Sequence, residues 1–163
     1  MNTNDEKLLI LLHAEWQLLD ASIQTLQHSA EKCRAIGVKS NYSFEEQESF
    51  DSLTSKFNRS SDLFTQKIIR TIWMLLHETH VPFIDLMNTT EKLGILFSAN
   101  QLITIRDIRN QIAHEYIPEA VCELIPEVID MTQQLVENIS YCENFLKQRK
   151  WIDLIDRQFI VYS

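Results

Sequence analysis

Residues 43–77 read SFEEQESFDSLTSKFNRSSDLFTQKIIRTIWMLLH. The serine at the start and Glu46 three residues later form a capping-box pattern, which predicts that a helix begins at Ser43. Pro82 disfavours the helical conformation in the residue before it, so we expect this helix to end near His77. Apolar residues recur along it at helical spacing, namely Phe50, Leu53, Phe57, Phe64, Ile68 and Leu75. The stretch therefore predicts one long amphipathic helix that turns an apolar stripe towards a core.

The scarcity of glycine and proline extends this prediction to the whole chain. Among 163 residues there are only 2 Gly and 3 Pro, whereas average usage is about 7% Gly and about 5% Pro. This composition nearly excludes a sheet protein with many tight turns. At this length one domain is the expectation, so we predict that residues 1–163 form a single all-helical domain.

Three further long helices are predicted from capping patterns, Gly37 and the prolines, and they span residues 3–36, 99–116 and 119–147. Pro126 falls inside the last of them, where it either kinks the helix or marks its true first turn. Between the long helices we expect a turn at residues 83–87 and a short helix opening at Asn88, and the tail from residue 151 to 162 is expected to add a helix or a strap. Long amphipathic helices with short joints predict a four-helix up-down bundle with short extra helices.

Charge and apolar runs limit the classes of function. The net charge of -8 argues against broad adsorption to nucleic acid or to an anionic membrane, although a local basic site is compatible with it. The longest apolar run, Leu8 to Leu12, is too short to cross a bilayer, and Asp5 and Glu6 are unlike a signal-peptide start. We therefore expect a cytoplasmic protein without a membrane partner.

The cysteines and histidines do not form a metal-binding pattern. The three cysteines have no CxxC spacing, so neither a disulfide framework nor a zinc site is indicated. We therefore expect no metal site and no cofactor.

The segment with the most specific pattern is RDIRNQIAHEY, residues 106–116. At about 100° per residue, Arg109 and Tyr116 lie within about 20° of each other on a helix, whereas His114 lies about 140° from Arg109. Arg109 and His114 could therefore serve one site only if the helix end is distorted or a second copy of the chain contributes. Without further information, Arg109 is equally explained as a surface charge and His114 as a residue favoured by the dipole at a helix C-terminus.

Arg109, Asn110, His114 and Tyr116 match the Arg-x4-His-x-Tyr signature of HEPN-domain proteins, and the chain resembles in particular the toxins encoded beside a minimal nucleotidyltransferase antitoxin. Two other segments are similar to this family: Phe57-x4-Asp62-Leu63-Phe64-x2-Lys67 on the helix of residues 43–77, and the run Leu93-Gly94-Ile95-Leu96. The resemblance covers roughly residues 50–120.

The resemblance implies a homodimer that acts as a metal-independent endoribonuclease and is neutralised by its nucleotidyltransferase partner. In this reading the RNA 2'-hydroxyl attacks the adjacent phosphorus, His114 moves the proton, and Arg109 clamps the phosphate. Asn110 is expected to position the phosphate or to hold the Arg109 and His114 pair. Tyr116 is expected to accept AMP from the partner.

Basic residues offer a path for RNA. By helical arithmetic Lys56, Arg59, Lys67 and Arg70 lie within about 80° of one another, and Arg106 is counted with them as an RNA-binding residue. The same residues are also explained as a solvated basic face. Asp62 lies at the edge of this arc, where it pairs with Arg59 or Gln66, or, as the resemblance implies, holds Arg109 or Arg106 from the facing helix.

Three functions from different classes remain open at this point. The first is the ribonuclease toxin, which the combination of Arg109, Asn110, His114 and Tyr116 favours. The second is a non-catalytic, substrate-binding accessory subunit of a nucleotidyltransferase pair, which the acidic balance mildly favours. The third is a helical interaction module in which the Arg-x4-His spacing is accidental.

Overall fold

The computed structural model describes residues 2–151, and all regular secondary structure among them is helical. Along the chain the elements are α1 (Thr3–Ile36), α2 (Phe44–Asp62), the π-helix η1 (Leu63–Ile68), α3 (Ile69–Leu75), α4 (Phe83–Lys92), α5 (Ala99–His114) and α6 (Pro118–Gln148). The prediction of an all-helical chain is confirmed for these residues. The tail predicted beyond residue 151 lies outside the described part of the chain.

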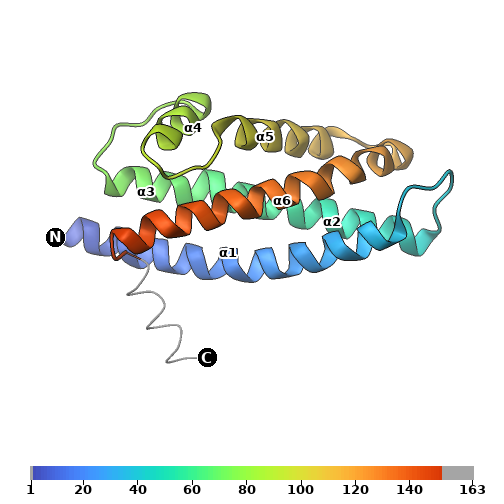
Figure 1. Ribbon diagram of the computed structural model, residues 1–163, viewed down its shortest axis with the longest axis horizontal. Helices are drawn as coiled ribbons and strands as arrows, with labels where there is room; N and C mark the ends of the chain where they lie inside the picture. Colours follow the sequence, from blue (N-terminus) through green and yellow to red (C-terminus); the bar gives the residue numbers. More distant parts are fainter. Residues whose placement is uncertain (1, 152–163) are drawn as a thin grey trace.

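The long helices lie side by side and alternate in direction (Figure 1). α1 packs against α2 and α3, and α6 packs against α1, α2 and α5, while the short α4 packs against α5. Buried apolar residues from all of these helices form one hydrophobic core cluster. The described residues therefore form a helical bundle, in which α5 packs against both α2 and α6.

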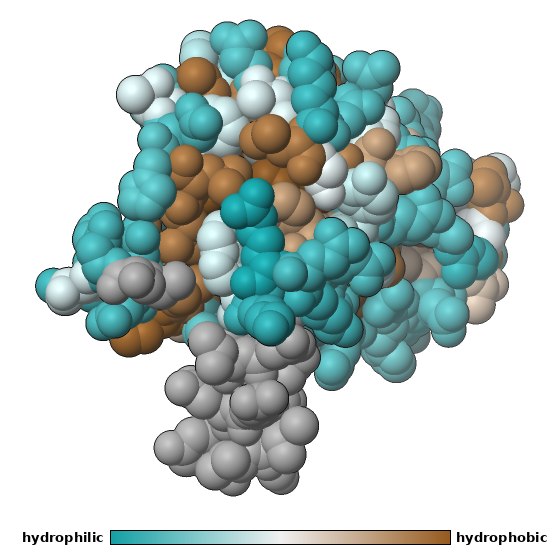
Figure 2. Space-filling view, turned by 60° about the vertical axis from the view of Figure 1, so that its left-hand side comes forward, coloured by the Kyte–Doolittle hydropathy of each residue, from teal (hydrophilic) through white to brown (hydrophobic). Residues whose placement is uncertain are grey.

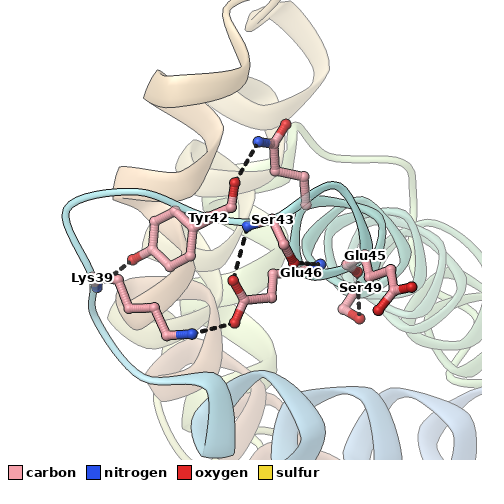
Figure 3. Close-up of polar contacts among 7 residues, drawn as sticks. Lys39, Tyr42, Ser43, Glu45, Glu46 and Ser49 are labelled. Atoms are coloured by element: carbon pink, nitrogen blue, oxygen red, sulfur yellow. Dashed lines mark hydrogen bonds and ion pairs between the residues drawn. The ribbon is translucent and has the colours of Figure 1, made fainter.

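The start of α2 follows the prediction closely (Figure 3). The Ser43 Oγ accepts a hydrogen bond from the Glu46 backbone N–H at 3.1 Å, and the Ser43 N–H donates to the Glu46 carboxylate at 2.9 Å. The same carboxylate pairs with the Lys39 ammonium. These bonds, that to Lys39 first, lower the pKa of Glu46. The capping box is thus confirmed, and it satisfies backbone donors that an uncapped helix end would leave free.

The long helix predicted for residues 43–77 contains a change of helix type. Residues Leu63–Ile68 form a π-helix, in which the backbone bonds run from i to i+5, and α-helix resumes at Ile69. The prediction of an uninterrupted α-helix is therefore wrong. Every member of the predicted apolar stripe is nevertheless buried: Phe50, Leu53, Phe57, Phe64, Ile68 and Leu75. One extra residue in a turn displaces later residues by about 100° around the helix axis. Residues before and after η1 that an uninterrupted α-helix would place on one polar face therefore lie on different faces.

α1 has the bounds predicted for it, and its N-cap is Asn2, whose Oδ1 accepts from the Asp5 N–H at 2.8 Å. The region before α5 differs from the prediction. The turn and short helix predicted between residues 83 and 93 are instead the single helix α4. Pro82 precedes it with its φ angle held near the helical value, so the chain can enter a helix at once.

α5 also ends earlier than predicted, at His114 instead of Tyr116. Glu115 and Ile117 have extended backbones, with ψ angles of 120° and 117°. Pro118 disfavours the helical conformation at Ile117 and itself forms the first turn of α6. α6 then continues through Pro126 to Gln148.

Asn138 fixes the start of α5 against α6. Its side chain is fully buried, and its Oδ1 accepts from the backbone N–H groups of Phe97 at 3.1 Å and Ser98 at 3.0 Å. Its Nδ2 donates to the Gln101 side chain and to the Gln134 carbonyl. Ser98 is the N-cap of α5, and its Oγ accepts from the Gln101 N–H at 3.3 Å. The Ser98 N–H that a capping box would direct to Gln101 is used by Asn138 instead.

One end of the bundle exposes apolar side chains. Figure 2 brings forward the end at which α1 begins and α6 ends, and it shows hydrophobic side chains gathered on this face within a hydrophilic border. α5 runs away from this end (Figure 1), so its C-terminal residue His114 lies towards the opposite end. In the described part of the chain, no helix has both the length and the apolar character to cross a membrane.

Glu15 is a buried carboxyl group between α1 and α3, and it yields a prediction for stability. The Thr71 hydroxyl donates to its Oε1 at 2.6 Å. Burial raises the pKa of Glu15, although the Thr71 bond and the charge of Lys67 act in the opposite direction. The folded protein therefore keeps this proton to a higher pH than the unfolded chain does, so the free energy of unfolding falls as the pH rises through this window.

Glu15→Gln keeps the oxygen that accepts from Thr71 but removes the ionisation. We expect it to raise the midpoint of thermal unfolding at pH 7 and to lose that advantage below the ordinary carboxyl pKa, at pH 4. Circular dichroism melts of both proteins at the two pH values measure this. Glu31→Gln, at an exposed position on the same helix, is the matched control, and equal shifts in the two variants would contradict the prediction.

Candidate functional site

Arg109 on α5 is held by Asp62, the last residue of α2. Its Nε donates to Asp62 Oδ1 at 3.0 Å and its Nη2 donates to Oδ2 at 2.8 Å, which makes a two-bond fork of the kind that fixes a guanidinium in place. The hydrogen bonds to Asp62 raise the pKa of Arg109, so its positive charge is secure. Of the partners considered for Asp62, the structure has Arg109 from the facing helix.

A groove of about 510 Å³ lies beside this ion pair, between the α2–η1 junction and α5. It is lined by Asp62, Leu63, Gln66, Lys67, Arg106, Arg109 and Asn110. Three of these side chains are cationic and one is anionic, so the groove is locally positive in a chain whose net charge is -8. Guanidinium, ammonium and amide donors around one hollow are suited to a phosphate group.

Arg106 also lines this groove, but its guanidinium has different partners from that of Arg109. Its guanidinium carbon lies 4.1 Å from the centroid of the Phe83 ring, so the planar cation stacks on the first residue of α4. Its Nε is buried and has no hydrogen-bond partner among the described residues. Arg106 therefore carries a positive charge that no carboxylate within residues 2–151 neutralises.

The basic residues of the long helix do not form the continuous strip that was predicted. Lys67 lines the groove, but the Arg70 guanidinium donates to the Val81 carbonyl at 2.9 Å. The Lys56 ammonium donates to Ser29 on α1 at 2.8 Å, and the exposed Arg59 is not among the groove residues. The arithmetic that placed these four within one arc assumed an α-helix throughout, and η1 lies between the first pair and the last residue.

The two residues at the end of α5 lie apart from the groove. His114 is the last residue of the helix and is exposed, and it does not line the groove that contains Arg109 and Asn110. Tyr116 is 86% exposed in the short connection to α6. The inference that Tyr116 shares a helical face with Arg109 is wrong, because α5 ends before it. The separation of about 140° between Arg109 and His114 stands, since both lie within the helix.

This arrangement divides the chemistry between two places. The groove supplies cations and amide donors that can hold a phosphodiester and stabilise charge on it. The imidazole of His114 lies outside the groove. In the described part of the chain, no three or more His, Cys, Asp and Glu side chains are grouped so that they could hold a metal ion.

Reasoning from sequence missed three contributors to this region. Leu63 and Gln66 line the groove beside Asp62 and Lys67, and Phe83 supports Arg106 from another helix. The bulky residue Phe83 directly after Pro82 was a signal for a helix start, and it was interpreted as a turn.

Comparison with protein-family models, with curated proteins and with solved structures found no match to this chain.

Proposed function

We propose that this protein is an endoribonuclease of the HEPN kind and the toxin of a toxin–antitoxin pair. The observation that carries the proposal is the fork between Asp62 and Arg109 at the edge of a positively charged groove. Because the chain as a whole is acidic, a local cluster of side chains suited to phosphate supports a function in which a phosphate group is bound. The Arg-x4-His-x-Tyr motif, whose arginine is the one held by Asp62, supports RNA as the source of that phosphate.

The proposed reaction uses the substrate's own nucleophile. The 2'-oxygen of the RNA forms a bond to the neighbouring phosphorus while the bond from phosphorus to the 5'-oxygen breaks. A base removes the proton of the 2'-hydroxyl, and an acid returns a proton to the departing 5'-oxygen, and His114 serves these transfers. Arg109 stabilises the negative charge that grows on the phosphoryl oxygens, and Asn110 donates a hydrogen bond to the same group.

Dimerisation brings the two parts of this chemistry together in the proposal. Within one chain His114 points about 140° away from Arg109 around α5, and it does not line the groove. Two copies that pair with their α5 helices facing each other supply His114 to a shared cleft. A homodimer is therefore part of the proposed active enzyme.

Neutralisation by a nucleotidyltransferase partner is the second element of the proposal. Tyr116 is 86% exposed, and its hydroxyl can therefore be reached by a modifying enzyme. In this transfer the Tyr116 hydroxyl oxygen would bond to the α-phosphorus of ATP while the bond to the departing pyrophosphate breaks and the hydroxyl proton is lost. The product carries a bulky anion close to the end of α5, where His114 lies. A negative phosphodiester at this point repels RNA phosphates.

Cleavage of RNA in the presence of EDTA tests the proposal. Purified protein is expected to cut single-stranded RNA and to leave 2',3'-cyclic phosphate and 5'-hydroxyl ends, because the 2'-oxygen is the nucleophile and no metal takes part. Mass spectrometry of the products identifies the ends. Arg109→Ala protein, purified in parallel, is the control for contaminating nucleases. Products with 3'-hydroxyl ends would contradict the mechanism, and RNA left intact by the wild-type protein would favour the accessory-subunit alternative, which the net charge of -8 also favours.

A further inference from the structure

Two arginines on the same helix reach the same groove in different electrostatic states. Asp62 occupies two of the five N–H groups of Arg109 and places a negative charge beside it. Arg106, one turn earlier on α5, has no carboxylate partner among the described residues, and its Nε is buried without an acceptor. A phosphate that enters the groove therefore meets two cations that form no ion pair among the described residues, Arg106 and Lys67.

The position of Arg106 is fixed before any ligand arrives. The Phe83 ring lies under its guanidinium at 4.1 Å, and Phe83 itself is buried at the start of α4. The segment leading into α4 is held in turn by Arg70, which donates to the Val81 carbonyl at 2.9 Å. Stacking covers one face of the guanidinium but leaves the N–H groups at its edge free to donate. Little conformational freedom then remains to be lost when a phosphate binds.

We propose that Arg106, together with Lys67, forms a binding subsite for a phosphodiester next to the one that is cleaved. This inference rests on the proposed function, and it divides the work between the two arginines. Arg106 and Lys67 bind RNA in the ground state. Arg109, restrained by Asp62, contributes mainly when negative charge grows on the reacting phosphate. Arg70 is a positioning residue that acts through Val81 and Phe83.

This division makes binding and catalysis separable by mutation. An interaction made equally in the ground state and the transition state changes affinity, whereas one that strengthens only in the transition state changes the rate of the chemical step. Loss of Arg106 should therefore appear in the dissociation constant of RNA. Loss of Arg109 should appear mainly in the rate of cleavage.

The test uses a fluorescent 2'-O-methyl hexanucleotide, which has RNA geometry but lacks the 2'-hydroxyl needed for cleavage. Fluorescence anisotropy measures its dissociation constant for the full-length chain and its variants. Arg106→Ala is expected to weaken binding roughly tenfold, the usual effect of losing a charged hydrogen bond. It should also make the slope of log affinity against log salt concentration shallower by about 0.7, because one phosphate contact to a single strand is lost. Arg106→Lys should fall between these values, since lysine keeps the charge but cannot stack as a plane on Phe83.

Matched variants separate this subsite from general charge effects. Arg34→Ala removes an exposed arginine at the far end of α1 and is expected to leave the dissociation constant unchanged. The double variant Asp62→Ala, Arg109→Ala removes the ion pair without leaving the Asp62 carboxylate unpaired, and it is expected to change the dissociation constant by less than about threefold, a small effect in free energy. Thermal melts check that each variant is folded, and if Arg106→Ala is not, Arg106→Lys carries the test.

Two results with the variants would overturn the inference. One is unchanged hexanucleotide binding in Arg106→Ala, or in Arg106→Lys where that variant carries the test. The other is a larger loss of binding in the double variant Asp62→Ala, Arg109→Ala than in Arg106→Ala, which would reverse the roles of the two arginines. 5'-AMP, with a single phosphate, is expected to bind more weakly than the hexanucleotide, and equal affinity would also overturn the assignment to an RNA strand. The proposed nuclease activity is judged separately with cleavable RNA, so an inactive protein that still loses hexanucleotide binding on Arg106→Ala would refute the nuclease and keep the subsite.

Discussion

His114→Ala is expected to lower the rate of RNA cleavage by about 10³-fold, because a positioned general acid or base typically contributes between about 10² and 10⁴. Arg109→Ala is expected to have an effect of similar size, since it removes the cation beside the reacting phosphate. Cleavage of a cleavable oligonucleotide under single-turnover conditions measures both effects. His28→Ala, at an exposed position on α1, is the matched control and should leave the rate unchanged.

Mixing the two inactive variants tests whether the site is shared between chains. In a mixed dimer of Arg109→Ala and His114→Ala, a shared cleft still contains one Arg109 and one His114. We therefore expect part of the activity to return when the proteins are combined, in proportion to the fraction of mixed dimers measured by native mass spectrometry. Mixed dimers that form and remain inactive would show that each chain needs both of its own residues.

Asn138→Ala is expected to lower the free energy of unfolding by about 3 kcal/mol, the largest effect that we predict for stability. The change leaves two backbone N–H groups, those of Phe97 and Ser98, without their acceptor. A donor stranded in this way costs about 1–3 kcal/mol where it is buried. The Gln101 side chain also loses its partner. Urea unfolding followed by circular dichroism measures the free energy.

Asn100→Ala is the matched control for this prediction. Asn100 is an exposed residue in the first turn of α5, so its removal should change the free energy of unfolding by less than about 0.5 kcal/mol. A loss of equal size in the two variants would show that Asn138 is not the link between α6 and the start of α5. An increase in stability at Asn138→Ala would exclude a cost from the stranded N–H groups.

Most of the fold could be predicted from sequence because its signals are local. The capping residues Ser43 and Ser98 mark the starts of α2 and α5, and the apolar stripe from Phe50 to Leu75 is buried throughout. Helix starts depend on a few neighbouring side chains and on backbone donors that any helix leaves free. Such signals are contained in a short window of residues.

The composition of the site could be predicted only in part, because it depends on contacts between distant segments. Asp62 was a candidate partner of Arg109 through the family resemblance, whereas helical arithmetic alone favoured neighbours on its own helix. The stacking of Arg106 on Phe83 joins α5 to α4, and no periodicity within either helix predicts it. The shift at η1 also has no local signal, since the apolar residues around it remain compatible with an α-helix.

The π-helix η1 makes the groove depend on the number of residues as well as on their kinds. Asp62 precedes η1 and Gln66 and Lys67 lie inside it, yet all three line the same groove. η1 joins α2, which packs against α1, α5 and α6, to α3, which packs against α1. Deletion or insertion of a single residue in η1 would rotate α3 relative to α2 about the helix axis, even if every other residue stayed the same. The number of residues in η1 is therefore a determinant of the site. Evolution can alter the site by inserting or deleting a residue here as well as by substituting one.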